Sequence, residues 1–158
     1  MNTDNPFETF QQEAFRLEAL PHYIVEDEKE AFSRFKQFGE LTYQSDSEWT
    51  RLVKTNVASS KSMKRLRLLS SELTPYEQFE LLSYPGVDAG EEIRVNARSL
   101  YEDKYLYDFW FFDNEYITQM YYGVDGVYID KVTRKANDDE KKMLAYWMSI
   151  FEESDVLE

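Results

Sequence analysis

Arginines recur at short spacing in the middle of the chain, and their side chains suit anion binding. Arg65 and Arg67 alternate with leucines, and Arg94 and Arg98 lie four residues apart in the segment EEIRVNAR. A planar guanidinium can hold an anionic group through two parallel hydrogen bonds, and a carboxylate placed beside it can act as a general base. The arginines therefore indicate either a substrate clamp or a set of structural ion pairs.

Carboxylates that could partner these arginines are Glu80, Glu91 and Asp108. Asp108 precedes the aromatic run FWFF, and a carboxylate beside buried rings must be paired, hydrogen-bonded or protonated to offset its desolvation. The expected network consists of Arg65, Arg67, Glu80, Glu91, Arg94 and Asp108. In the structural interpretation, the network fixes a helix on the sheet. In the catalytic interpretation, Arg67 and Arg94 clamp an anion in a cleft, and Glu80 or Asp108 is the general base.

Residues for several other chemistries are missing. The chain has no cysteine and a single histidine, His22, which removes thiolate sites and weakens a zinc interpretation. No nucleophile with a histidine partner and no glycine-rich phosphate loop is visible. Asp108 and Asp113 are five residues apart, so on one strand they point to opposite faces and cannot share a metal. We expect neither a metal nor a cofactor.

Composition predicts a globular, strongly acidic protein of one domain over residues 1–158. Aromatic residues make up 16% of the chain, and the net charge is −13. This charge argues against direct binding to nucleic acid, although it would let carboxylates imitate a phosphate array towards a nucleic-acid-binding partner. The basic segment KSMKRLR, residues 61–67, is expected to be a strand whose charges pair with acids elsewhere.

Helical patterns dominate the first half of the chain. Asn5 and Pro6 predict a helix start, and the apolar spacing from Phe7 to Leu17 predicts that this helix continues through residue 17. A second helix with phenylalanines at spacing three should end at Gly39, and a third should begin at a capping box formed by Ser45 and Glu48. Residues 63–69 alternate as a strand does, and a helix follows from a Thr74 cap to the pair Pro85 and Gly86.

Strand patterns dominate from residue 92 onward. Residues 92–98 alternate, and three further strands separated by DNE and GVDG predict an antiparallel meander. The run FWFF should be a core strand covered on both faces, with Asp113 starting a turn. Tyr121, Tyr122 and Tyr128 fit ordinary cross-strand packing better than a stacking platform. A last helix, capped by Asn137 and Glu140, should close over the sheet. These elements predict an α+β fold with an antiparallel sheet of about five strands, N-terminal helices and a C-terminal helix packed on it.

A succession of short motifs resembles an uncharacterised, mainly actinobacterial family of unknown function. The matching residues are Arg16 to Glu18, Trp49, Arg65 and Arg67, Tyr76, Phe79 and Glu80, the run AGEEIR at 89–94, and DFWFFD at 108–113. The last two motifs are the specific ones. The chain departs from the family pattern at residues 95–98, where Val-Asn-Ala-Arg replaces Trp-Leu-Pro-Arg. Because members often accompany helix-turn-helix regulators, the resemblance implies a bacterial regulatory or interaction role.

We therefore expect a non-catalytic bacterial regulatory or protein-interaction module. Its acidic surface would bind a protein partner such as a DNA-binding regulator or a phage or defence component. The alternative is a small hydrolase or transferase that acts on an anionic substrate through the Arg/Glu/Asp network. No basic leader and no apolar run of membrane-spanning length is visible, so a cytoplasmic location without membrane association is the simplest expectation.

Overall fold

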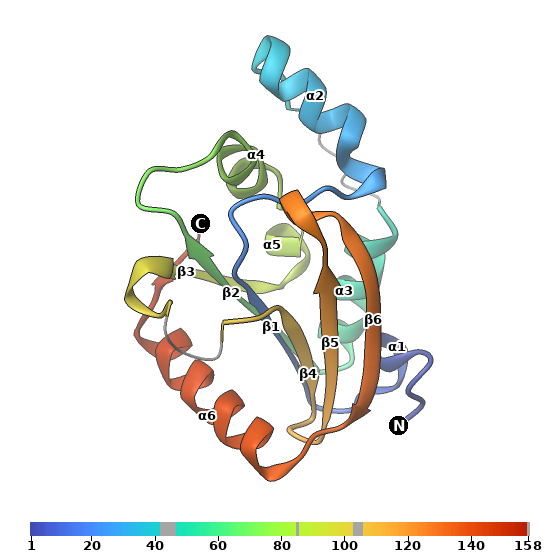
Figure 1. The fold of residues 1–158 in the computed structure, drawn as a ribbon. Helices are drawn as coiled ribbons and strands as arrows, with labels where there is room; N and C mark the ends of the chain where they lie inside the picture. Colours follow the sequence, from blue (N-terminus) through green and yellow to red (C-terminus); the bar gives the residue numbers. More distant parts are fainter. Residues whose placement is uncertain (42–46, 85, 103–105, 158) are drawn as a thin grey trace.

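The fold is built on one mixed sheet. The computed structural model describes residues 1–41, 47–84, 86–102 and 106–157, which form seven strands in the order β6-β5-β4-β1-β2-β3-β7 (Figure 1). The strands are β1 (Glu13–Glu18), β2 (Ser62–Leu69), β3 (Glu92–Ala97), β4 (Phe109–Phe112), β5 (Tyr116–Tyr122), β6 (Tyr128–Lys135) and β7 (Asp155–Val156). The central strands β1, β2 and β3 are parallel, and all other neighbouring strands are antiparallel.

The α+β class is confirmed, but the expected five-stranded antiparallel sheet is wrong, because the sheet has seven strands and is mixed. Parallel neighbours need crossover connections, which the helices between β1, β2 and β3 supply. The helices are α1 (Pro6–Thr9), α2 (Lys29–Phe38), α3 (Glu48–Ala58), α4 (Pro75–Ser83), α5 (Gly86–Ala89) and α6 (Asp138–Glu153), with short 3₁₀ turns η1 (Glu26–Glu28), η2 (Arg98–Leu100) and η3 (Val124–Gly126). The meander β4-β5-β6 has the predicted antiparallel order.

The first predicted helix is wrong beyond its opening turn. Pro6 does start a helix, but α1 ends at Thr9 and residues 13–18 form β1. In this strand Ala14 and Leu17 lie on opposite faces of the sheet, in different apolar clusters. A central strand covered on both faces carries apolar residues in no fixed period, so the helical spacing here was accidental.

The predicted capping residues mark the starts of α4 and α6 and the end of α2, whereas α3 has a different cap from the predicted one. Thr74 with Glu77 and Asn137 with Glu140 form the predicted capping boxes of α4 and α6. The cap of α3 is Ser47, whose hydroxyl accepts a hydrogen bond from the Thr50 amide. The predicted cap Ser45 and the predicted helix breaker Pro85 lie outside the described residues. At the end of α2, Gly39 adopts a left-handed conformation with φ of 67°, as the prediction of a glycine stop requires.

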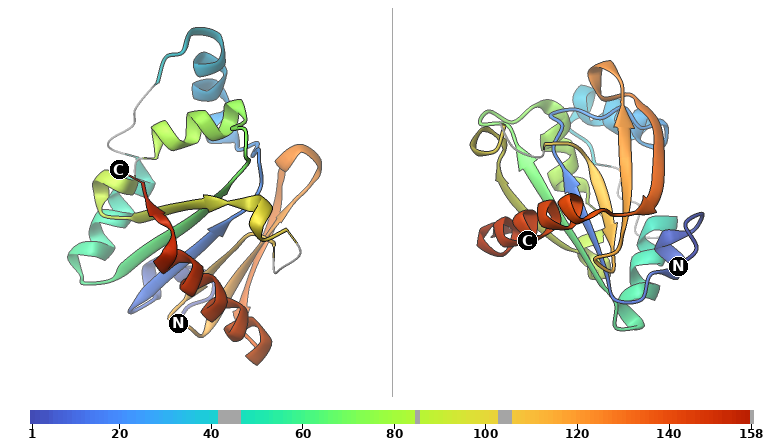
Figure 2. Two further views of the ribbon diagram at one scale, coloured as in Figure 1. Left: turned by 90° about the vertical axis from the view of Figure 1, so that its left-hand side faces the viewer. Right: turned by 60° about the horizontal axis from the view of Figure 1, so that its bottom comes forward.

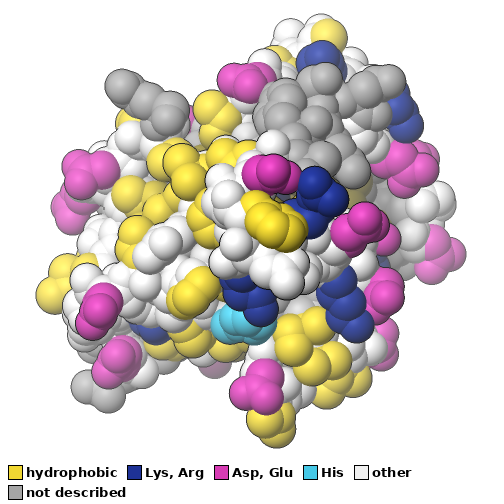
Figure 3. Space-filling view, turned by 90° about the horizontal axis from the view of Figure 1, so that it is seen from above, with side chains coloured by type: hydrophobic (Ala, Val, Ile, Leu, Met, Phe, Trp, Pro, Cys, Tyr) yellow, Lys and Arg dark blue, Asp and Glu magenta, His cyan; other side chains and the backbone are white. Residues whose placement is uncertain are grey.

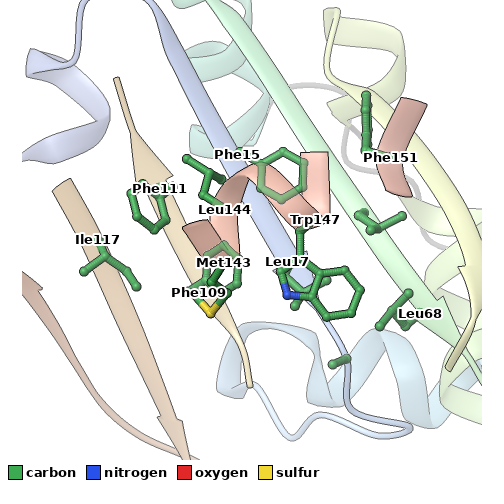
Figure 4. Packing of buried hydrophobic residues seen from close by; sticks show 12 residues of the cluster. Phe15, Leu17, Leu68, Phe109, Phe111, Ile117, Met143, Leu144, Trp147 and Phe151 are labelled. Atoms are coloured by element: carbon green, nitrogen blue, oxygen red, sulfur yellow. The ribbon is translucent and has the colours of Figure 1, made fainter. Parts of the chain in front are cut away.

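Apolar side chains form a cluster on each face of the sheet. Figure 2 shows helices on both sides of the sheet, and Figure 4 shows the side chains of the cluster that includes α6. On one face they pack under α6, and the buried members are Phe15, Leu17, Ala19, Leu66, Leu68, Phe109, Phe111, Ile117, Met143, Leu144, Trp147 and Phe151. On the other face α1, α3 and α5 cover Phe10, Ala14, Val53, Met63, Ala89, Trp110 and Phe112. The aromatic run of β4 alternates between the two clusters, so the prediction of a doubly covered core strand is confirmed.

A third apolar cluster joins α2 to α4. Its buried residues are Tyr23, Phe32, Tyr76 and Phe79, and Phe35 packs against them. Phe38, by contrast, is 65% exposed, so the phenylalanine stripe of α2 is only partly core-facing. In the described parts of the chain, no helix is long and apolar enough to cross a membrane.

Candidate functional site

A cluster of charged side chains lies at the carboxyl ends of β1 and β2, on the sheet face away from α6. The parallel register places Arg16 beside Arg65 and Glu18 beside Arg67, and the strand period turns all four side chains to the same face. Carboxylates from α4, from the start of β3 and from the residue before β4 complete the cluster. We call it the Arg/carboxylate network, and its members are Arg16, Glu18, Arg65, Arg67, Glu80, Glu91 and Asp108.

Glu18 is the centre of this network. Its carboxylate lies 3.0 Å from Arg65 Nη1, 3.5 Å from Arg67 Nε and 3.8 Å from Arg16 Nη2. The Tyr84 hydroxyl also donates a hydrogen bond to it. Burial by itself would raise the pKa of Glu18, but the charges of Arg65, Arg67 and Arg16 outweigh it and hold the pKa at about 2. Glu18 therefore carries a full negative charge among the arginines.

Glu80 on α4 also contacts Arg67 but is in a different electrostatic environment. Arg67 Nε donates to Glu80 Oε1 at 2.7 Å, and Arg67 Nη1 donates to the Leu68 carbonyl at 3.0 Å. Burial, followed by the nearby charge of Glu18, raises the pKa of Glu80 to about 8, and the attraction of Arg67 offsets this only in part. Burial is the larger cause of the raised pKa, and the charge count adds to it, because three guanidiniums of the network face four carboxyl groups. A proton on Glu80 makes the network neutral.

Glu91 anchors the opposite side of Arg65. Arg65 Nε donates to Glu91 Oε1 at 2.7 Å, and the Trp49 indole donates to Glu91 Oε2 at 3.1 Å. The Arg65 guanidinium also lies over aromatic rings, 5.7 Å from the Trp49 centroid and 5.5 Å from that of Trp110. The Glu91 carboxylate packs directly against Gly86, where a Cβ would stand only 1.8 Å from Oε2. Glycine is thus required for this ion pair to form.

Asp108 joins the network through Arg16. Arg16 Nη2 donates to Asp108 Oδ2 at 3.0 Å, the Ala19 amide donates to Oδ1 at 3.0 Å, and the Tyr23 hydroxyl donates to Oδ2. Burial raises the pKa of Asp108 above its usual range despite the Arg16 charge. Arg16 also donates to the Tyr122 hydroxyl at 3.2 Å. These bonds tie the entry to β4 to the end of β1.

The structure brings together five of the six predicted network residues and excludes Arg94. In the register of β2 and β3, Arg94 lies beside Leu66, so it shares the face covered by α6. There it pairs with Glu92 at 2.8 Å and donates to the Phe151 and Glu152 carbonyls at 3.2 and 3.0 Å. Arg98 lies just beyond β3, which ends at Ala97. It donates to Ser70 Oγ at 2.6 Å, and its Nη1 is 3.7 Å from Glu77 Oε2.

Sequence reasoning about the site missed Arg16 and Glu18, the pair at the centre of the network. They were noted only as part of a family motif, because the segment was read as a helix. Alternation in the run AFRLE would have placed both on one face had the segment been read as a strand. Three tyrosines bond to the network, Tyr23, Tyr84 and Tyr122, and their spacing in the sequence gives no signal of this role.

The remaining candidates have structural roles. Asp113 sits in the turn after β4, as predicted, and its carboxylate accepts hydrogen bonds from the amides of Gln11, Gln12 and Glu13 at 2.7 to 3.0 Å. In the basic segment, Lys64 pairs with Glu13 at 3.0 Å, so the expected pairing with distant acids is confirmed. Tyr121 and Tyr122 point to opposite faces of β5 and form no shared platform.

His22 lies between β1 and η1, where it is half-buried. It lines a pocket of about 210 Å³ with Phe32 and Tyr76. The ring centroids of these two lie 5.7 and 5.2 Å from that of His22. Across the described ranges, no group of three or more histidine or acidic side chains is arranged to hold a metal ion.

The network is largely closed to solvent, and its most exposed member is Arg65, at 12%. The side chains of Arg67 and Glu91 are 0% exposed, those of Asp108 and Glu18 are 2% and 6% exposed, and that of Glu80 is 7% exposed. Within it each charged group contacts at least one opposite charge. Arg67 Nη2 forms no hydrogen bond, and the nearest carboxylate oxygen in its ion pairs, Glu77 Oε2, is 4.0 Å away. As arranged, the groups bind one another and join α4 and β4 to the central strands.

Comparisons with known proteins agree with this description of the fold. A family model described as "Domain of unknown function (DUF6879)" matches residues 1–155, which confirms the resemblance to a family of unknown function. No curated protein matches the chain. A solved structure described as a phospholipase D family member, Nuc from Salmonella typhimurium, is similar with a TM-score of 0.56 over 96% of this chain and 86% of that one. The identity is 6%, so this likeness shows the fold alone.

Proposed function

We propose that this chain, which belongs to the family described as "Domain of unknown function (DUF6879)", is a non-catalytic regulatory module of bacteria that binds another protein through an acidic surface. The observation that carries the proposal is the closed state of the Arg/carboxylate network. Its guanidinium and carboxyl groups are the side chains best suited to bind or react with a substrate, yet they are buried and paired with one another. A buried network of this kind fixes how helices pack on a sheet.

The alternative, a small hydrolase or transferase for an anionic substrate, has less support. It needs Arg67, Glu80, Arg94 and Asp108 in one cleft. Arg94 lies on the opposite face of the sheet, and the other three side chains are at most 7% exposed. A raised pKa such as that of Glu80 does occur at catalytic sites, but burial and an excess of carboxyl groups account for it here. The geometry therefore favours the binding role.

Exposed carboxylates at the end of α6 are the best candidate for the acidic surface. Glu152, Glu153 and Asp155 are exposed there, and the last turn of α6 contains no basic residue. Acids at a helix C-terminus face the negative end of the helix dipole, so they cost stability in the free protein. Arg94, which donates to the Phe151 and Glu152 carbonyls, and Lys64, 4.0 Å from Glu152, offset only part of this cost. We infer that a positively charged partner compensates for this cost.

A hollow beside these acids supports the same surface. It has a volume of about 440 Å³, and its lining is part apolar and part polar: Leu69, Leu73, Val95 and Ala97 with Ser70, Ser71, Asn96, Glu153, Ser154 and Asp155. On the face seen from above, acidic, basic and hydrophobic side chains are interspersed (Figure 3). Apolar surface bordered by polar and charged residues is typical of protein interfaces. The partner proposed for it is a basic protein, such as a DNA-binding regulator or a phage or defence component.

Charge reversal at the end of α6 tests this function. The variant Glu152→Lys, Glu153→Lys, Asp155→Lys should lose capture of a basic DNA-binding protein encoded in a neighbouring reading frame. The matched control is Glu26→Lys, Asp27→Lys, Glu30→Lys, which changes the net charge equally at exposed sites on η1 and α2 and should retain capture. Equal binding by both variants, or no binding by the unaltered protein, would contradict the proposal.

A further inference from the structure

Strand β6 leaves one edge of the sheet open. It is the terminal strand in the sheet order, and seven of its eight residues are exposed, the exception being the half-buried Thr133 (Figure 1). An eight-residue edge with exposed backbone is long enough to pair with another strand. Proteins normally cover or shorten such an edge, because its unpaired N–H and C=O groups can bind a further strand.

The register identifies which backbone N–H and C=O groups of β6 make no bond to β5. The Met120 amide donates to the Asp108 carbonyl at 3.1 Å, so even-numbered residues of β5 bond towards β4 and odd-numbered residues bond towards β6. Beyond β6, the Ala136 amide donates to the Glu115 carbonyl at 2.8 Å, in agreement with this alternation. Even-numbered residues of β6 therefore bond to β5. The N–H and C=O groups of Lys131, Thr133 and Lys135 point away from β5. Two of them make local bonds that an added strand would have to replace: the Lys131 amide donates to Asp130 Oδ1 at 2.8 Å, and the Lys135 carbonyl accepts from Arg134 Nη1 at 3.3 Å.

Two of these residues, Lys131 and Lys135, are positively charged. Strand β6 holds three cations and one acid in a chain of net charge −13. Arg134 is held by Glu140 through two contacts of 2.7 Å. Among the described residues, by contrast, no carboxylate lies within ion-pair distance of Lys131 or Lys135. Both lysines lie on the sheet face away from α6, because Thr133 between them bonds to the Thr118 hydroxyl on that face.

We propose that the edge of β6 binds an extended acidic segment of a partner protein as an added strand. The segment would place carboxylates four residues apart, opposite Lys131 and Lys135, with a small polar residue between them opposite Thr133. Val132 and Ile129, which are 44% and 63% exposed, would gain apolar contacts on the two faces. Lysine on an edge strand opposes pairing with uncharged strands, so the same lysines select for an acidic one.

A second copy of this chain fits the edge poorly, for a geometric reason. In a two-fold antiparallel pair of identical strands, residues that face each other lie on the same side of the sheet, so both are odd-numbered or both even-numbered. Lys131 and Lys135 are odd-numbered, whereas the acid of β6, Asp130, is even-numbered and lies on the other face. No such register gives either lysine a carboxylate from within the strand. An acidic partner segment satisfies both lysines.

This inference concerns a basic edge and does not depend on the acidic surface at the end of α6. Its probe is the fluorescein-labelled peptide TEVTVET, which has glutamates four apart on one face, and its readout is fluorescence anisotropy with the full chain. We expect saturable binding, weakened on the order of tenfold by the double substitution Lys131→Glu, Lys135→Glu. The matched control is Lys141→Glu, Lys142→Glu on exposed positions of α6, which should leave binding unchanged.

Two further measurements separate strand pairing from simple charge attraction. The peptide TKVTVKT should bind the Lys131→Glu, Lys135→Glu variant better than it binds the unaltered protein. A version of TEVTVET with alternate amides N-methylated keeps its charge but loses the backbone donors, so it should not bind. The proposal is overturned if the methylated peptide binds equally well, if both double variants bind alike, or if sedimentation shows that the edge is occupied by a second copy of the chain.

Discussion

The substitution Glu80→Gln should stabilise the protein at neutral pH, although it removes an apparent ion pair with Arg67. Burial and the charge of Glu18 raise the pKa of Glu80 from 4.5 to about 8 in the folded state. Its contribution to stability is therefore fully present below pH 4.5 and is lost as the pH rises towards 8. Glutamine resembles the protonated side chain and can still accept from Arg67 Nε, so the variant escapes this loss.

The magnitude follows from proton linkage. At about 1.4 kcal/mol for each pH unit between 4.5 and about 8, the loss amounts to about 5 kcal/mol at high pH and about 3 kcal/mol at pH 7. Glu80→Gln should match the unaltered protein near pH 4.5 and exceed it in free energy of unfolding by about 3 kcal/mol at pH 7. Urea unfolding at pH 5, 6, 7 and 8, followed by fluorescence of the three tryptophans, measures this difference.

Glu18→Gln is the matched control, since it makes the same chemical change on the other carboxylate near Arg67. The pKa of Glu18 is lowered from 4.5 to about 2, so its contribution is present above pH 4.5 and is lost as the pH falls. Its removal should cost about 3 kcal/mol at pH 7, with the opposite sign to Glu80→Gln. If Glu80→Gln instead destabilises the protein at pH 7, Glu80 is ionised and the charge assignment within the network is wrong.

Four further substitutions probe the network and the elements around it. Gly86→Ala should lower the free energy of unfolding by about 2–3 kcal/mol, because its Cβ would meet the Glu91 carboxylate at 1.8 Å; denaturant titration measures the loss. Arg67→Leu should cost about 3–5 kcal/mol by leaving buried carboxylates unpaired, whereas Arg94→Leu should cost about 1 kcal/mol on its partly exposed face; equal losses would contradict the placement of Arg94. Thr74→Ala should cost about 1 kcal/mol through loss of the α4 cap, and an unchanged thermal midpoint would contradict the capping role.

Local signals in the sequence determined much of the fold. The capping boxes at Thr74 and Asn137, the glycine stop at Gly39 and the alternation in β2 each act within a few residues, so their structural effect can be predicted without the rest of the chain. The doubly covered strand β4 was also predictable, because four consecutive aromatics leave neither face exposed to water. Arg65, Arg67 and Asp108 were recognised as candidates because buried charge requires a partner.

Only the tertiary structure decided how these parts combine. Residues 13–18 form a strand because β2 and β4 bond to both of its edges, and no local pattern records those neighbours. The same pairing places Arg16 and Glu18 at the centre of the network, and the register of β3 turns Arg94 to the other face. Register and strand order depend on contacts between residues far apart in the chain, whereas composition and spacing report only on local preference.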